Sequence, residues 1–587
     1  MAPALPPEWE LPRMRSSLNF EDANRNADDA YSDTGKLHLP DIKSYSFEFF
    51  DAKFYPYNPP GSSPVFAAQG ALNCSCTWAR DPVTERALLC VAGRDAKVKV
   101  YNIHDGKAVT SFVGHGGEIN DLATSPINPH LIVSASDDTT VRLWSLDPIH
   151  KKQPCVCLLG GEGHSWNLLS VAFHDTGRYV VSAGHDQVIN LWTLPDIPNE
   201  HLDNPIIVHF PHFSTSEIHT GLIDCVSFYG DLILSRACLE DLIVLWRVEG
   251  FDSTAKPPSP EQAPSNQDTT KLTRSAFLLP SIPSAPTAEV IDSSSAQPVA
   301  VSTHPYTRLL QLHTPGCGPQ FFMRFGLFNL AGHHPVLAFC NATAKIFFWD
   351  LTCFSAYRQF MTANLRRERQ RSATGQIGER PVPRPPWMRI VAPRKRPTEH
   401  NSANGNNVGA NLLSSIGGRR LRENHSELGL MERAGAGEGS ERDSSVASFA
   451  VGSGGMAASG AAASVAVSVL ESTAASTTTG PAAAKGTATT TSAGATPKGR
   501  SAVGYSITDM YNQETLDDWN SKYNTNDPHT LVKAHKTETT KGLSAVGRQV
   551  AWSPEGEWCV VVGSNSRIMI LQRWANSETS HPAEESD

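Results

Sequence analysis

One stretch of the chain repeats itself with a fixed internal spacing. Each copy opens with a Gly-His pair and ends with an Asp and a Trp: His115, Asp138 and Trp144 in the first copy, and His164, Asp186 and Trp192 in the second. In both copies the aspartate stands six residues before the tryptophan. Self-similarity at a period of roughly 20–50 residues indicates small structural units that bury their apolar faces only by stacking on one another. The chain is therefore expected to fold as an array of repeats.

A Gly-His near the start and a Trp near the end of a unit of about 40–45 residues is typical of a WD40 propeller blade. A third unit carries His219, Glu240 in the Asp position, and Trp246, and a further unit ends at Trp349. With strand-like segments before and after these units, seven candidate blades are present. The predicted fold class is all-β, a seven-bladed WD40 β-propeller with a shortened first blade, since a closed propeller protects every sheet edge.

Composition divides the remaining chain into tails and insertions. Segments rich in Pro, Ser, Ala, Thr and Gly bury too little apolar surface to offset the entropy lost on ordering. The expected organisation is a disordered tail at 1–42, blades one to six at 43–352 with a loop insertion at 252–300, a low-complexity disordered insertion at 353–528, the last blade at 529–575 and a disordered tail at 576–587.

Charge and cysteine content exclude several classes of function. The formal net charge of -9 does not suit a general nucleic-acid binder, because phosphate contacts need clustered Lys and Arg. The N-terminus has no apolar core of a secretory signal, and membrane association is not expected. The cysteines form no Cys-x-x-Cys pair, so reduced, buried thiols of an intracellular protein are expected, with no metal and no cofactor. The basic segment 380–397 fits a nuclear import signal, a contact to nucleosomal DNA or a solvated linker equally well.

Ser134 or Ser136, together with His115 and Asp138, has the residue types of a hydrolase site. The same His, Asp and Trp recur in the next repeat, however, whereas nucleophilic catalysis needs one activated nucleophile with an oxyanion hole. Recurrence favours a structural hydrogen-bond chain within each blade. The protein is therefore not expected to be an enzyme, and its function is expected to be recognition.

Longer strings are more specific than the blade pattern. The strings are Gly114-His-Gly-Gly-Glu-Ile-Asn-Asp121, Asp224-Cys-Val226, Gly230-Asp-Leu-Ile-Leu-Ser235 and Phe321-Phe-Met-Arg-Phe325. They resemble the EED/ESC family, the Polycomb WD40 subunits of Polycomb repressive complex two. The resemblance covers roughly residues 44–352 and 529–575. The long Ala/Ser/Thr insertion lies outside the family core, and its composition indicates a divergent fungal member.

The resemblance implies a non-catalytic scaffold and methyl-lysine reader. Family members bind a repressive trimethyl-lysine of histone tails in an aromatic cage, hold a helix of the methyltransferase subunit on the opposite face, and stimulate that enzyme to maintain gene silencing in the nucleus. The implied cage positions here are Phe50, Phe321 and Phe322, with Cys74 at a fourth position where the family has an aromatic. Sequence-specific nucleic-acid binding is not implied.

Two other interpretations remain open at this point. Adjacent residues of a strand point to opposite faces, so one of Phe321 and Phe322 would pack in the core if they lay on a strand. The chain would also fit a WD40 adaptor of another complex, such as a ubiquitin ligase or an RNA-processing assembly. Roughly 25 residues of a first blade of about 40–45 are missing before Ala71, so that blade and the fourth cage wall are expected to be incomplete.

Overall fold

The computed structural model describes residues 11–19, 48–59, 61–70, 73–265, 271–278, 304–374, 382–392, 464–468, 506–539 and 545–573. The chain divides into two compact units, one of Met1–Ala392 with Ala461–Asp587 and one of Pro393–Gly460. All described residues belong to the first unit. No helix in this part of the chain is long and apolar enough to cross a membrane.

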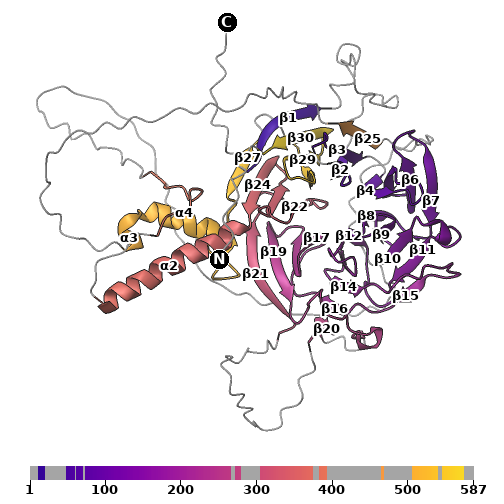
Figure 1. The fold of residues 1–587 in the computed structure, drawn as a ribbon. Coiled ribbons are helices and arrows are strands. Elements are labelled where there is room, and N and C mark those ends of the chain that lie inside the picture. The colour runs from indigo at the N-terminus through magenta and orange to yellow at the C-terminus, as the bar shows by residue number, and fades with distance from the viewer. Residues whose placement is uncertain are drawn as a thin grey trace, which may run out of the picture. The chain divides into compact units, whose positions relative to one another are not determined.

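The strands of the first unit form small sheets arranged around a common centre (Figure 1). Three consecutive sheets come from the first half of the chain. They are β4 (Asn73–Arg80), β5 (Ala87–Gly93), β6 (Lys97–Asn102) and β7 (Ala108–Val113); then β8 (Ile119–Thr124), β9 (Leu131–Ser136), β10 (Val141–Ser145), β11 (Cys155–Leu159) and β15 (Ile206–Val208); then β12 (Leu168–Phe173), β13 (Tyr179–Gly184), β14 (Ile189–Thr193), β16 (Phe213–Thr215) and β20 (Thr273–Ser275).

Four further sheets complete the described set. They are β17 (Ile223–Tyr229), β18 (Leu232–Ala237), β19 (Leu242–Val248), β21 (Tyr306–His313) and β26 (Leu531–Val532); then β22 (Gly326–Phe328), β23 (Val336–Cys340), β24 (Lys345–Asp350) and β27 (Lys536–Thr539); then β28 (Gly547–Trp552), β29 (Trp558–Gly563), β30 (Arg567–Gln572) and β1 (Arg13–Asn19); and a short sheet of β2 (Phe49–Phe54), β3 (Val65–Gly70) and β25 (Ser464–Ser468).

The apolar cores lie between neighbouring sheets. Strands in the middle of a sheet are buried on both faces and are therefore almost continuously apolar, as in Tyr179–Gly184, where every residue is buried. Val181 and Ile189 of one sheet pack in one cluster with Val226 and Trp246 of the next. Each sheet thus depends on its neighbours for a buried face, which is the stacking that the repeats predicted.

The inner strands share one irregularity that later positions the site. In six of the seven described sheets, the pairing register of the inner strand with its neighbour shifts once near the start of the strand, and one residue is left unpaired there as a β-bulge. The bulged residues are Phe50, Cys74, Asn120, Leu169, Asp224 and Arg548. Since the shift occurs at the corresponding place in these six sheets, the bulged residues lie at the same level of their inner strands.

The propeller is predicted correctly in class, whereas its number of blades differs. Six described sheets have the four or five strands of a full blade, and the seventh has only three. The short sheet contains β2 and β3 and no further strand from the following residues, because Asn73 already begins β4 of the next sheet. The expected shortening of the first blade therefore falls on this sheet.

The N-terminal tail was expected to be disordered over residues 1–42, and this is wrong for residues 13–19. Strand β1 pairs antiparallel with β30 at the outer edge of the β28–β30 sheet. Met14 packs against the core of that sheet, and Lys536 Nζ donates hydrogen bonds to the carbonyls of Leu11 (3.0 Å) and Pro12 (2.7 Å). The outer edge of β30 is covered in this way by a strand from the other end of the chain.

The boundaries of the last blade also need correction. Residues 531–532 and 536–539 form β26 and β27, which pair with β21 and β24 of the two preceding sheets. The last blade itself consists of β28, β29 and β30 with β1.

Within the expected loop 252–300, the structure describes the short helix η2 (Pro260–Gln262) and β20, which adds a fifth strand beside β16. A second short helix, η1, spans Pro148–His150. The expected tail 576–587 lies outside the described residues.

The insertion 353–528 was expected to be disordered, yet it contains a helical module. Helices α2 (Thr352–Thr374), α3 (Ile507–Met510) and α4 (Gln513–Tyr523) lie beside β24 and β27 (Figure 1). Tyr357 and Phe360 of α2 and Trp519 of α4 are buried in one apolar cluster with Met388. Of the basic segment 380–397, only residues 382–392 are described.

Candidate functional site

The repeated His, Asp and Trp form a hydrogen-bond chain in three blades. In one blade, His115 joins Asp138 (Nδ1 to Oδ2, 2.8 Å) and Ser134 (Nε2 to Oγ, 2.6 Å), and Trp144 Nε1 donates to the same Ser134 Oγ (2.8 Å). The next blade repeats this arrangement. Its members are His164, Asp186, Ser182 and Trp192, joined by bonds of 2.8–2.9 Å. In each chain the hydroxyl is already bonded to a tryptophan, so the recurrence supports architecture rather than catalysis.

Glu240 takes the acidic position in a third blade. His219 Nδ1 lies 2.5 Å from Glu240 Oε2, and Ser235 Oγ accepts from Trp246 Nε1 at 3.0 Å. Burial opposes ionisation of Glu240, but hydrogen bonds from His219 and Thr220 outweigh it and lower its pKa to about 2. The carboxylate is therefore charged at neutral pH.

Trp349, which was predicted to share this motif, lacks the hydrogen-bond chain. Its side chain is fully buried, but its indole N–H has no hydrogen-bond partner among the described residues. Phe339 occupies the strand position that corresponds to Ser134, so no hydroxyl is available there. In this blade His334 pairs with Asp350 instead (Nδ1 to Oδ2, 2.7 Å).

This difference between blades gives a matched pair of substitutions. Trp192→Phe removes the donor to Ser182 and is expected to cost about 1 kcal/mol more free energy of unfolding than Trp349→Phe, which loses no hydrogen bond. Both changes remove a similar buried volume, so the difference isolates the hydrogen bond. Chemical denaturation of both variants checks the expectation, and equal destabilisation would contradict it.

The structure brings Phe50, Phe321 and Phe322 together. The ring centroids of Phe50 and Phe322 are 6.1 Å apart in an edge-on arrangement, and those of Phe321 and Phe322 are 5.1 Å apart. Phe321 is 45% exposed, and Phe50 and Phe322 are half-buried. These three residues, called the phenylalanine cluster below, therefore keep part of their aromatic surface accessible to solvent.

Local backbone geometry explains why both adjacent phenylalanines belong to the cluster. Phe321 and Phe322 precede β22 and are not part of a strand, so the alternation of a strand does not apply to them. Phe322 has a φ of 54°, a left-handed conformation that costs energy in a bulky residue and is often found at functional sites. Met323 is fully buried, and its N–H donates to Asp224 Oδ2 (3.2 Å), which fixes the end of the segment.

Two arginines lie against the phenylalanine cluster. The Arg324 guanidinium is 5.5 Å from the ring centroid of Phe322, and the Arg548 guanidinium is 5.7 Å from that of Phe50. Arg548 donates to the carbonyl of Phe321 (2.5 Å) and pairs with Glu48 (2.9 Å). Arg548 thereby connects the two segments that supply the phenyl rings, and both arginines are buried.

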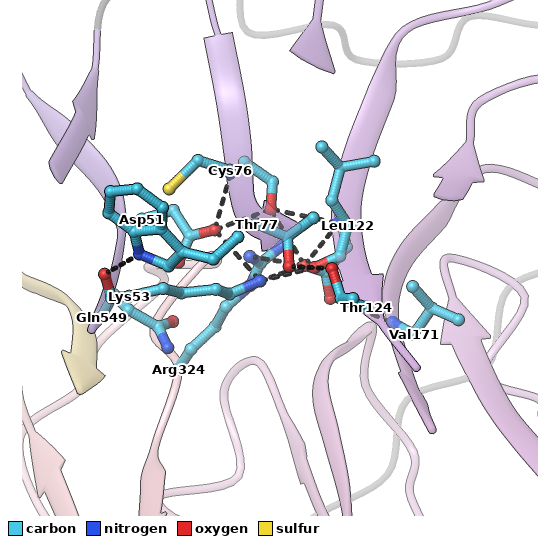
Figure 2. Close-up of polar contacts among 12 residues, drawn as sticks. Asp51, Lys53, Cys76, Thr77, Leu122, Thr124, Val171, Arg324 and Gln549 are labelled. Atoms are coloured by element: carbon cyan, nitrogen blue, oxygen red, sulfur yellow. Dashed lines mark hydrogen bonds and ion pairs between the residues drawn. The ribbon is translucent and has the colours of Figure 1, made fainter. Parts of the chain in front are cut away.

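Arg324 extends from the phenylalanine cluster into a buried polar network (Figure 2). Its guanidinium donates to Asp121 (3.2 Å) and to the carbonyls of Asn120 and Leu169 (2.9 Å each). Burial disfavours the charged form, but Asp121 and Asp51 outweigh this and raise the pKa of Arg324. One buried cation thus joins the inner strands β8 and β12 to the segment that carries Phe322.

Asp51 extends the same polar network to the inner strands β2 and β4. Its carboxylate accepts from Ser75 Oγ (2.7 Å) and from the N–H of Cys76 (3.0 Å), and Lys53 Nζ lies 3.4 Å away (Figure 2). Sequence reasoning missed Arg324, Arg548 and these carboxylates as parts of the site. A charged residue within or just before an otherwise apolar inner strand was the available signal, because such a charge is rarely buried without a partner.

Cys74, the fourth predicted position, is the bulged residue of β4 and carries a half-buried thiol. Its Sγ donates to Glu118 Oε1 at 2.9 Å. Burial and this carboxylate both raise the pKa of the thiol, so it is neutral at physiological pH. None of the eleven cysteines forms a disulfide, and ten of them are buried. In the described part of the chain, no group of three or more His, Cys, Asp or Glu side chains is arranged to hold a metal ion.

The circle of small sheets and the Trp-Ser-His-Asp chains define a WD-repeat propeller protein. In agreement, the family model described as WD domain, G-beta repeat matches residues 106–145 and 155–193. The Polycomb protein EED of Chaetomium thermophilum is 43% identical over 618 aligned residues, which cover 97% of this chain and 96% of that protein. The Polycomb protein esc of Drosophila melanogaster is 35% identical over 190 residues, covering 30% of this chain and 43% of that protein.

Solved structures agree with the sequence relatives. A chain of the crystal structure of Chaetomium thermophilum polycomb repressive complex 2 is 39% identical, with a TM-score of 0.66, and the match covers 97% of this chain and 99% of that chain. A chain from the structure of ctPRC2 in complex with H3K27me3 and H3K27M also has 39% identity and a TM-score of 0.66, covering 97% and 100%. The chain belongs to the EED/esc family of Polycomb proteins.

Proposed function

We propose that the protein is a non-catalytic scaffold of Polycomb repressive complex 2 and reads trimethyl-lysine of histone tails at the phenylalanine cluster. The observation that carries the reader function is the convergence of Phe50, Phe321 and Phe322, which come from distant parts of the chain and remain partly exposed. Support for the complex comes from relatives solved as polycomb repressive complex 2, one of them with H3K27me3.

The chemistry of the cluster suits a quaternary ammonium ion. Such an ion has diffuse charge and no N–H donor, so it is held by cation–π attraction and apolar contact with aromatic faces. The buried arginines under Phe50 and Phe322 are already hydrogen-bonded to backbone and carboxylate acceptors. Their hydrogen bonds keep the supporting residues in place, and the exposed faces of the rings are left for a ligand.

Further parts of the proposal follow from family membership. The short β2–β3 sheet acts as a reduced seventh blade, so that the six full blades and this sheet close one propeller. The methyltransferase subunit binds elsewhere on the propeller, and peptide binding stimulates it through a coupling free energy of about 1–3 kcal/mol. The complex acts on chromatin in the nucleus.

The experiment is peptide binding by calorimetry with the full chain and a trimethylated histone H3 peptide. Phe322→Ala is expected to weaken binding by about 2–30-fold, because one cation–π contact contributes about 0.5–2 kcal/mol. Phe322→Tyr, which keeps an aromatic face, is expected to retain most of the affinity. Val109→Ala, an exposed change on the outer strand β7, serves as the control. Unchanged affinity in Phe50→Ala, Phe321→Ala and Phe322→Ala alike would reject the reader function.

A further inference from the structure

Cys74 and Phe50 occupy equivalent positions on neighbouring inner strands. Each is the bulged residue of its strand, β4 and β2 respectively. The residues that directly follow them are connected, since Asp51 Oδ2 accepts from Ser75 Oγ at 2.7 Å and from the N–H of Cys76 at 3.0 Å. Cys74 therefore stands next to Phe50 at the level of the phenylalanine cluster.

A carboxylate accompanies the small side chain of Cys74. Glu118, which immediately precedes β8 on the next inner strand, accepts from Cys74 Sγ at 2.9 Å through one oxygen, and its side chain is 29% exposed. A cysteine has a single heavy atom beyond Cβ, so it leaves open the space that an aromatic ring would fill. The side of the cluster next to Phe50 is thus bordered by a carboxylate in place of a fourth ring.

The charge of Glu118 is only weakly compensated. It pairs with Arg94, whose Nε lies 3.9 Å away on a side chain that is 69% exposed. Exposed ion pairs of this length contribute little to either partner. A second carboxylate, Asp137, is close by: its N–H donates to the carbonyl of Glu118 at 2.8 Å, and its side chain is half-buried. The carboxylate of Glu118 therefore brings a negative charge next to Cys74.

A carboxylate at this place distinguishes methylation states by hydrogen bonding. A trimethylammonium group has no N–H and gains only charge attraction from Glu118, whereas a dimethylammonium group has one N–H and can donate it to the carboxylate. Charge-assisted hydrogen bonds are roughly twice as strong as neutral ones. A dimethylammonium group also needs fewer apolar walls, and three phenyl rings are present.

We infer that Glu118, together with the short side chain of Cys74, makes this site a reader of dimethyl-lysine, which binds at least as tightly as trimethyl-lysine. The inference rests on the proposed function, because it concerns the same phenylalanine cluster. Glu118 acts as the specificity-determining residue: its carboxylate accepts the ammonium N–H, and the three rings hold the two methyl groups and the lysine methylene chain.

The test is calorimetry of the full chain with one histone H3 peptide around lysine 27, carrying two or three methyl groups. Wild type is expected to bind the dimethyl peptide at least as tightly as the trimethyl peptide. Glu118→Gln keeps the size of the side chain and is expected to weaken dimethyl binding about fivefold relative to trimethyl binding. Glu85→Gln is the matched control, since it removes the same charge at an exposed turn paired with Arg80.

A second variant adds the aromatic ring that is missing at position 74. Cys74→Tyr supplies a fourth ring and is expected to tighten trimethyl binding by about 2–30-fold and to reverse the preference. Melting temperatures of all variants verify that each is folded. A wild type that prefers the trimethyl peptide, with a preference unaltered by Glu118→Gln, overturns the inference and leaves the proposed function standing. Failure of both peptides to bind overturns the proposed function as well.

Discussion

Arg236→Ala is expected to lower the free energy of unfolding by about 3–5 kcal/mol, because it leaves the carboxylate of Asp224 buried without its cation. Neither side chain of this pair is exposed, and Arg236 Nη1 lies 2.5 Å from Asp224 Oδ2. The Arg236 guanidinium also lies 5.3 Å from the ring centroid of Phe339, so packing is lost along with charge. Chemical denaturation measures the change.

A double variant separates the two roles of Asp224, which pairs with Arg236 and also holds the backbone of Met323. Arg236→Met with Asp224→Leu replaces the pair by apolar residues and is expected to recover most of the stability, since such replacements of buried pairs are often neutral. The double variant should nevertheless bind the histone peptide more weakly than wild type. The reason is that Asp224 also accepts the N–H of Met323 and thereby fixes the segment of Phe322. A single variant as stable as wild type, or a double variant with full peptide affinity, would contradict this account.

The blade architecture could be predicted because its signal is local and repeated. His115, Asp138 and Trp144 recur at fixed spacing, and the hydrogen-bond chain follows from those residue types. Trp349 shows the limit of this reasoning. A tryptophan at the correct place does not reveal that Phe339 has replaced the serine of the chain, unless the strand register is known as well.

The cage positions Phe50, Phe321 and Phe322 were available from a family resemblance and not from periodicity. Strand alternation predicts that two adjacent phenylalanines diverge, and only the left-handed backbone at Phe322 lets both join one cluster. The supporting cations were not predictable in this way. Arg324 reaches acceptors on β8 and β12, more than 150 residues away in sequence, so its role depends on how distant blades pack around it.

The outer strands and the helical module were missed for a different physical reason. Strands β26 and β27 are short. Each of the strands β1, β26 and β27 forms by pairing with the free edge of another sheet that is far away in sequence. In the insertion, Cys353, Tyr357 and Phe360 have the spacing of a helix face. Composition averaged over the whole insertion obscured this pattern, since the surrounding segments are polar and rich in small residues.

Trp519→Ala is expected to unfold the helical module while the propeller stays folded. The Trp519 side chain is fully buried, its indole N–H donates to the carbonyl of Arg389 (2.8 Å), and its ring centroid is 4.7 Å from that of Tyr511. Loss of a buried tryptophan costs about 3–5 kcal/mol. Trp519 also contacts the ring of Phe360 on α2 (6.3 Å between centroids), so its loss should open α2 and α4 locally rather than spread.

Hydrogen exchange and limited trypsin digestion of the full chain measure this effect. Faster exchange across α2 and α4 and new cleavage at Arg358 and Arg366 are expected, with unchanged exchange in β8–β14 and unchanged affinity for the histone peptide. Trp166→Ala is the control, because Trp166 is 51% exposed and its loss should change stability by less than about 0.5 kcal/mol. Unaltered protection of α2 and α4 would show that Trp519 does not hold the module together. Loss of protection in β8–β14 as well would show that the insertion folds as one cooperative unit with the blades it interrupts.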